Sequence, residues 1–254
     1  MSFDLLGRYG PRLLDGLLVT LQLVSVSIVL GALLAIPVTA ARLSQSRVIG
    51  AFAYAYVYFF RGTPLLAQLF LVYYGAGQFR PALESVGLWG FFREAFNCAV
   101  FTFTLNTAAY QAEIYRGAIR SVAAGQWEAA RALGLGRLPV LMRVVLPQAA
   151  VIALRPLGNE IILMIKGSAV ASIVTVHELM GQTERAFSRS FDMAIYLYAA
   201  LLYLIIVEAI RRLWGRLESR LTRHLRREDL PSARSVLSST RPLEPVEQPQ
   251  RSGT

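Results

Sequence analysis

The sequence predicts an all-α, polytopic membrane protein with about five transmembrane helices, and the distribution of apolar and charged residues carries that prediction. The chain has 254 residues, of which 55% are hydrophobic and 17% are charged. Residues 16–41 form a run of 26 residues without a charge. As an α-helix this run would be ~39 Å long at ~1.5 Å per residue, which exceeds the ~30 Å hydrocarbon core of a bilayer.

An N-terminal secretory signal peptide is the alternative explanation of this first apolar run. Its apolar stretch would be only ~7–15 residues long and would follow a basic start. The run here is longer, and Asp4 and Asp15 accompany Arg8 and Arg12 around its beginning. The sequence therefore favours a transmembrane helix.

Five apolar segments are long enough to cross a membrane. The second is interrupted by Arg61, the fourth contains Glu160 and Lys166, and the fifth contains Glu208 near its end. The expected spans are residues 13–41, 48–74, 95–115, 156–176 and 193–210.

The positions of the basic residues predict the orientation. With the N-terminus outside, the inner segments 42–47, 116–155 and 211–254 hold 2, 6 and 10 Lys or Arg residues, whereas the three outer segments hold 2 each. Positively charged residues concentrate on the cytoplasmic side of membrane proteins. The N-terminus is therefore expected outside and the C-terminus in the cytoplasm, and the net charge of +10 reflects topology rather than nucleic-acid binding.

The chain divides into a membrane domain, residues 1–228, and a tail, residues 229–254. The tail is rich in Pro and Ser and poor in apolar residues, so it is expected to be a disordered cytoplasmic segment. The arginines that follow the last span are expected to hold this end inside and to attract anionic lipid.

The longest inner segment, residues 116–155, carries a candidate docking element. Residues 126–133 read as a short helix with Trp127, Ala130 and Leu133 on one side. Glu128 and Arg131 are spaced to pair across a turn, and Gly134 permits a chain reversal. Such a helix can lie in a groove on a partner protein. A solvated connector is the alternative, but it would not need this apolar content.

The motifs of this segment resemble those of binding-protein-dependent ABC transporter permeases. Glu128-Ala129-Ala130, Gly134 and Val144-x-Leu146-Pro147 match the spacing of the EAA loop of that family, with Val144 in place of Ile. Three further stretches are similar to polar amino acid permeases of the histidine, arginine and opine group: 61–70 (RGTPLLAQLF), 110–119 (YQAEIYRGAI) and 158–164 (GNEIILM).

This resemblance implies the transmembrane domain of a type I ABC importer in the bacterial cytoplasmic membrane. It implies three kinds of protein partner: a dimer of ATP-binding subunits, a second permease subunit and an extracytoplasmic solute-binding protein. It also implies that ATP and magnesium are bound by the ATPase, so this chain needs no cofactor of its own. The residues implied to contact the ATPase are Gln126, Trp127, Glu128, Ala129, Ala130, Arg131 and Gly134.

Charged residues inside the spans are candidate contacts for the substrate, because an intramembrane charge costs ~2.5–3.5 kcal/mol unless it faces a partner or water. Glu160 can receive a cationic group, and Asn159 can add a hydrogen bond. Arg61 offers a fork for a carboxylate, next to Thr63 at a helix-breaking Gly-Thr-Pro sequence. The alternatives are structural: Glu160 paired with a neighbouring helix, and Arg61 paired with an internal acid such as Glu113.

The sequence argues against an enzyme and against a metal site. Lys166 is the only lysine and lacks the glycines that a P-loop requires before it. Cys98 and His177 stand alone, without the partners of a metal site. An ion-gradient-driven secondary transporter is the competing function, but it predicts inverted repeats, which the sequence does not show. The substrate expected from the resemblance is a polar, basic amino acid or a derivative such as an opine.

Overall fold

A computed structural model describes residues 3–222, and these residues are helical throughout, with short connections and no strand. The expected tail, residues 229–254, lies outside the described residues. The helices are α1 (Phe3–Arg42), α2 (Arg47–Gly62), α3 (Leu65–Gln78), α4 (Arg80–Ser85), α5 (Trp89–Phe92), α6 (Ala95–Arg120), α7 (Ala124–Ala132), α8 (Arg137–Pro139), α9 (Leu146–Gly167), α10 (Leu179–Ser190) and α11 (Ala194–Leu221). A π-helical segment, η1 (Val140–Val145), precedes α9, and a 3₁₀ segment, η2 (Ser168–Val174), follows it.

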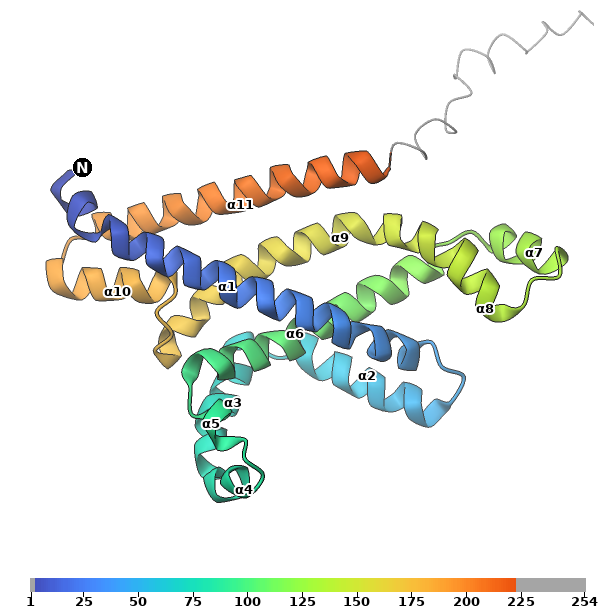
Figure 1. The fold of residues 1–254 in the computed structure, drawn as a ribbon, viewed down its shortest axis with the longest axis horizontal. Helices are drawn as coiled ribbons and strands as arrows, with labels where there is room; N and C mark the ends of the chain where they lie inside the picture. Colours follow the sequence, from blue (N-terminus) through green and yellow to red (C-terminus); the bar gives the residue numbers. More distant parts are fainter. Residues whose placement is uncertain (1–2, 223–254) are drawn as a thin grey trace, which may run out of the picture.

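The long helices lie roughly along one axis of the molecule (Figure 1). The N-terminus and α10 mark one end, and α7 and α8 mark the other. α1, α6 and α11 run from the first end towards the second, and α9 runs back. Helices α4 and α5 form a side arm below this bundle. This arrangement separates α7, the candidate docking helix, from the opposite end by the full length of the spans.

The membrane-spanning character of the fold agrees with the prediction. Three helical stretches of the described chain are long and apolar enough to cross a bilayer: Gly7–Arg42, Arg137–Val174 and Ala194–Leu221. Helices α2 and α3 qualify together, although they are bent by 104° at the break between them. With α6 as the fifth span, the architecture is compatible with the five expected helices.

The break between α2 and α3 falls at Thr63 and Pro64, as the Gly-Thr-Pro sequence suggests. Pro64 has no N–H to continue the helical hydrogen bonds, so carbonyl groups before it lose their partners. The Gln68 side chain supplies the missing donor: its Nε2 lies 3.0 Å from the Phe60 carbonyl oxygen and 3.1 Å from the Thr63 carbonyl oxygen. Asn106 of α6 donates to the same Phe60 carbonyl and to Gln68 Oε1. The backbone carbonyl groups at the bend therefore find hydrogen-bond partners within the chain.

Helix α6 is the centre of the bundle, even though it is less apolar than the other spans. One side packs against α1, where Phe103 of α6 and Leu23 of α1 are fully buried in the main hydrophobic cluster. The contact is close at Gly31 of α1, where an added Cβ would lie 2.4 Å from the Thr107 Cγ2 atom. Close approach at a glycine is typical of membrane helix packing. It also places α1 carbonyls beside the polar side chains of α6.

A buried carboxylate connects three helices at the α10 end of the bundle. Glu178 caps α10 by accepting a hydrogen bond from the Gly181 N–H, and it also accepts bonds from the Thr20 and Tyr203 hydroxyls. These partners join α1, α10 and α11. Burial raises the pKa of Glu178 above its ordinary value, and the hydrogen bonds oppose that rise. Glu178 therefore acts as a joint between three helices.

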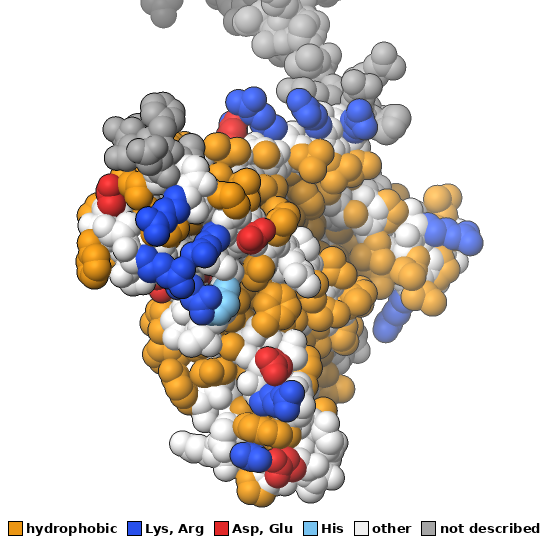
Figure 2. Space-filling model, turned by 60° about the vertical axis from the view of Figure 1, so that its left-hand side comes forward, with side chains coloured by type: hydrophobic (Ala, Val, Ile, Leu, Met, Phe, Trp, Pro, Cys, Tyr) orange, Lys and Arg blue, Asp and Glu red, His pale blue; other side chains and the backbone are white. Residues whose placement is uncertain are grey.

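The surface around α10 and the start of α1 carries exposed arginines. Figure 2 shows basic side chains gathered on this end of the molecule. Arg8, Arg12, Arg185 and Arg189 are all exposed there. Partial burial and the charge of Arg185 lower the pKa of His177, so the positive charge comes from the arginines at neutral pH.

Candidate functional site

The candidate docking helix α7 is held to the rest of the chain by one side only. Ala130 is 4% exposed and packs in a cluster with Val140 and Val145 of η1, and Trp127 packs against that cluster. The opposite side, including Gln126, Glu128 and Ala129, is exposed. A helix fixed along one side in this way presents its other side as a surface for a partner.

This arrangement corrects two details of the sequence prediction. Trp127, Ala130 and Leu133 do not share a side, because Leu133 is 80% exposed whereas Ala130 is buried. The side with Ala130 packs against the chain itself, and the exposed side carries polar residues together with Leu133. Glu128 and Arg131 form no ion pair in the described part of the chain. α7 also begins and ends slightly earlier than the expected residues 126–133.

Gly134 ends α7 in the conformation that the sequence suggests. Its φ is +74°, in the left-handed region that side chains with a Cβ avoid. The Gly134 N–H donates to the Arg131 carbonyl, and the Leu135 N–H donates to the Ala130 carbonyl. These two bonds form a Schellman motif, which closes a helix and reverses the chain. Gly136, by contrast, has an ordinary φ of −66°.

Glu160, the main candidate for substrate contact, is buried beside α6. It is 6% exposed and accepts a hydrogen bond of 2.9 Å from the Thr107 hydroxyl. Thr107 in turn accepts a bond from Gln111 Nε2, which also reaches the Ile28 carbonyl of α1. No cation of the described chain lies within ion-pair distance of Glu160. Asn159 is next to it in sequence but exposed.

Arg61 and Thr63 occupy the bend between α2 and α3. Thr63 is engaged in the bend itself, because its hydroxyl donates to the Phe59 carbonyl and accepts from Gln68. The Arg61 guanidinium is exposed and lies over the Tyr110 ring of α6, 5.2 Å from the ring centroid. Arg61, Tyr110 and Glu113 line two adjacent hollows of ≈360 and ≈410 Å³. The structure thus brings Arg61 to a cavity but does not bring it into contact with Thr63.

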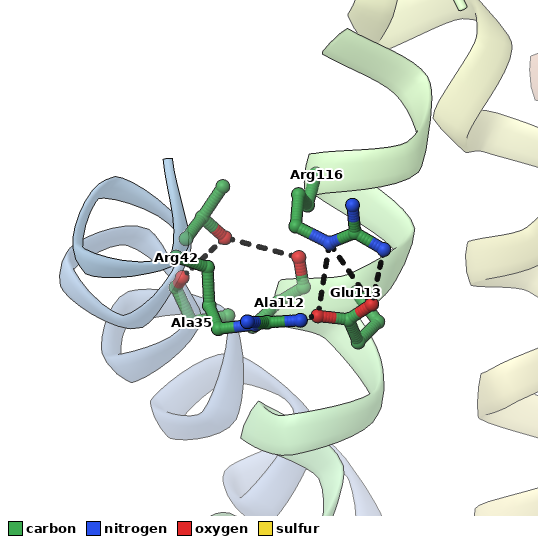
Figure 3. Close-up of polar contacts among 6 residues, drawn as sticks. Ala35, Arg42, Ala112, Glu113 and Arg116 are labelled. Atoms are coloured by element: carbon green, nitrogen blue, oxygen red, sulfur yellow. Dashed lines mark hydrogen bonds and ion pairs between the residues drawn. The ribbon is translucent and has the colours of Figure 1, made fainter. Parts of the chain in front are cut away.

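The alternative pairing of Arg61 with Glu113 is not formed. Glu113 binds two other arginines, Arg42 of α1 at 3.0 Å and Arg116 of α6 at 2.6 Å (Figure 3). In the described residues Arg61 has no acidic partner. Its guanidinium therefore remains available beside the two hollows.

Sequence reasoning missed most of the polar residues of α6. Asn106, Thr107 and Gln111 each bind another helix or the bend, and Glu113, which was expected only as a partner for Arg61, binds Arg42 of α1. The signal was present, since Thr107 and Gln111 are four residues apart and therefore lie on one side of a helix. Uncharged polar residues in a predicted span can be read as partners for neighbouring helices.

The comparisons with known proteins agree with the geometry. Residues 27–223 match the family described as binding-protein-dependent transport system inner membrane component. The chain is 41% identical to the nopaline transport system permease protein NocM of Agrobacterium fabrum, over 89% of this chain and 94% of the relative. It is 36% identical to the arginine ABC transporter permease protein ArtM of Haemophilus influenzae, over 84% and 93% respectively.

A solved structure shows the same fold. The chain superimposes on the crystal structure of an amino acid ABC transporter with histidines with a TM-score of 0.79 and 32% sequence identity, over 87% of this chain and 99% of that one. An inward-facing MetNI methionine ABC transporter, at 20% identity, shares the fold with a TM-score of 0.70.

Proposed function

The chain belongs to the family of binding-protein-dependent transport system inner membrane components, and from this premise we propose that it imports a basic amino acid or an opine. Its similarity to permeases named for nopaline, octopine and arginine supports this substrate class. Family membership also decides against the ion-gradient-driven alternative. The chain is a membrane permease subunit, and its part in import is to form the path of the substrate.

The single observation that carries the coupling part of this proposal is the half-attached helix α7. Its buried side fixes it to η1, and its exposed side, Gln126, Glu128 and Ala129, is free for an ATPase subunit. Closure of an ATPase dimer that holds this side would move α7, and the packed cluster would pass the movement to η1 and α9. The energy for import then comes from ATP, which the partner ATPase would bind together with magnesium.

The other partners follow from the same proposal. A second permease subunit, identical or homologous, completes the path. The arginines around α10 offer a docking surface for a solute-binding protein with acidic residues, because opposite charges speed and orient encounter. This assignment places the α10 end and the N-terminus outside, and α7 in the cytoplasm of a bacterium. Membrane lipid covers the apolar exterior.

Within the path, we assign Glu160 and Asn159 of α9, and Arg61 and Thr63 of the bend, to the substrate. Glu160 accepts a hydrogen bond from a hydroxyl and forms no ion pair in the described residues, with only the more distant charge of Arg61 acting on it, so a cationic substrate group could pair with it directly. Arg61 forms no ion pair in the described residues and lines a cavity, so its guanidinium suits the carboxylate of an amino acid. Thr63 would contribute through the position that it gives Arg61.

Uptake by the reconstituted transporter tests the proposed function. The permease is placed in proteoliposomes with its ATPase and binding protein, and accumulation of labelled arginine and octopine is compared with that of leucine. We expect ATP-dependent accumulation of the basic substrates and none of leucine. Accumulation by the permease alone, driven by a sodium or proton gradient, would contradict the proposal.

The variant Glu160→Gln tests the substrate contact. It keeps the size of the side chain and can still accept a bond from Thr107, but it removes the charge. We expect uptake to fall about tenfold, equivalent to ~1.4 kcal/mol, with unchanged assembly and basal ATPase activity. Thr107→Val is the matched control, because it removes the partner of Glu160 while leaving the charge. If Glu160 were only structural, Thr107→Val would lower uptake as much as Glu160→Gln does.

A further inference from the structure

Three arginines from different parts of the chain meet at one hollow beside the docking helix. Arg120 ends α6, Arg131 lies in the last turn of α7, and Arg137 begins α8. All three line a hollow of ≈900 Å³. The fold, and not their spacing in sequence, therefore gathers these positive charges.

The charge around this hollow is not balanced by the chain. No aspartate or glutamate is among the residues that line it. None of the three arginines has an acidic partner in residues 3–222, whereas Arg42, Arg116 and even the exposed Arg80 each pair with a glutamate. Like charges that converge without counter-charges repel one another. An anion in the hollow would remove that repulsion.

Apart from Gln45 and Gly136, the remaining residues that line the hollow are apolar, and several lie where helices end. Leu43 directly follows the last residue of α1, and Ile119 is one residue from the end of α6. Trp127 adds an indole, a side chain typical of the boundary between lipid and water. The hollow thus combines a basic part with an apolar part at the membrane surface.

We propose that this hollow binds a phosphate-bearing anion, and that its source is an anionic phospholipid of the adjacent leaflet. Guanidinium groups bind phosphate oxygens through two parallel hydrogen bonds, and the apolar wall suits an acyl chain. Basic pockets between helices on the cytoplasmic side of membrane proteins bind anionic headgroups in this way. The proposal goes beyond the transport function and requires only that this end of the molecule lies at the membrane surface.

The consequence is a lipid that holds the docking helix in place. Arg131 and Trp127 belong to α7, and Arg120 belongs to α6. A headgroup bound to both arginines ties the orientation of α7 to the end of a transmembrane helix. Coupling would then depend on the lipid composition of the membrane.

Retention of lipid by the purified permease–ATPase assembly tests the proposal. The assembly is exchanged into detergent with phosphatidylglycerol or phosphatidylcholine, and bound lipid is counted by native mass spectrometry. We expect retained phosphatidylglycerol, little phosphatidylcholine, and at least a fivefold loss of phosphatidylglycerol in R120Q/R137Q. Arg143→Gln is the matched control, because Arg143 is exposed nearby on η1 but does not line the hollow. Equal retention by R120Q/R137Q and the wild type would overturn the proposal.

Two further arms separate the possible sources of phosphate. Glycerol phosphate is expected to displace no phosphatidylglycerol at millimolar concentration, and displacement would overturn the lipid assignment. If the permease alone retains phosphatidylglycerol but loses it when the ATPase binds, the hollow belongs to the ATPase interface instead, and the lipid assignment is overturned. If R120Q/R137Q does not assemble, Arg120→Gln and Arg137→Gln are each expected to lose part of the bound lipid.

Discussion

Gly134→Val is expected to lower ATP-driven uptake at least tenfold while the chain still inserts into the membrane. A β-branched side chain at φ +74° is strongly disfavoured, and the left-handed conformation costs an ordinary residue ~1–2 kcal/mol. The chain can escape that strain only by opening the Schellman motif that ends α7. The exposed side of α7 would then change its orientation and would no longer fit the ATPase. Uptake and co-purification of the ATPase measure the effect.

Gly136→Val is the matched control for this prediction. Gly136 lies two residues further along the same reversal, but its φ of −66° suits any residue. An added Cβ there would have only the Pro139 ring within 4 Å, at 3.8 Å. Uptake is expected to stay within twofold of wild type. Equal losses in both variants would show that bulk in this loop matters, and not the backbone conformation of Gly134.

Gly181→Ala is expected to destabilise the α10 end of the bundle severely. An added Cβ would lie 2.4 Å from the Val176 carbonyl oxygen, and a backbone atom cannot move aside as a side chain can. The Gly181 N–H also donates a hydrogen bond to the Glu178 carboxylate. A displaced Gly181 therefore disturbs the contacts through which Glu178 connects α1, α10 and α11. Overpacking of this kind costs ~1–3 kcal/mol. We expect the melting temperature of the purified assembly to fall by about 5 °C or more.

Gly75→Ala supplies the comparison for Gly181→Ala. Gly75 lies within α3, and nothing is within 4 Å of the Cβ that alanine would add. Alanine also favours a helix over glycine by up to ~1 kcal/mol. The melting temperature of Gly75→Ala should equal or exceed that of wild type. A melting temperature of Gly181→Ala that matched it would contradict the backbone clash.

The apolar segments and the docking loop could be predicted from the sequence because their signals are local. A long run without charge defines α1, Pro64 defines the bend, and Gly134 defines the end of α7. Each of these residues acts through its own backbone or through burial of its own segment. The helical membrane fold followed from such signals, and the family followed from the resemblance of the motifs.

The partners of the polar residues could not be predicted, because they depend on how distant helices pack. From the sequence, Glu113 could pair with Arg42, Arg61 or Arg116. The way in which α1 crosses α6 brings Arg42 to Glu113, which also pairs with Arg116 of its own helix. The free side of α7 depends in the same way on η1, which takes Ala130 into its cluster. The roles proposed for Glu160, Asn159, Arg61 and Thr63 stay predictions.

The polar character of α6 has a consequence for the order in which the chain is built into the membrane. Gln111 donates to a carbonyl of α1, Thr39 of α1 donates to the Ala112 carbonyl, and Glu113 pairs with Arg42 of α1. A helix with these groups unpaired enters lipid poorly, since each unsatisfied polar group costs several kcal/mol there. During synthesis α1 emerges from the ribosome before α6. The helix that α6 needs is therefore already in the bilayer when α6 arrives, and the translocation machinery can release the two as a pair.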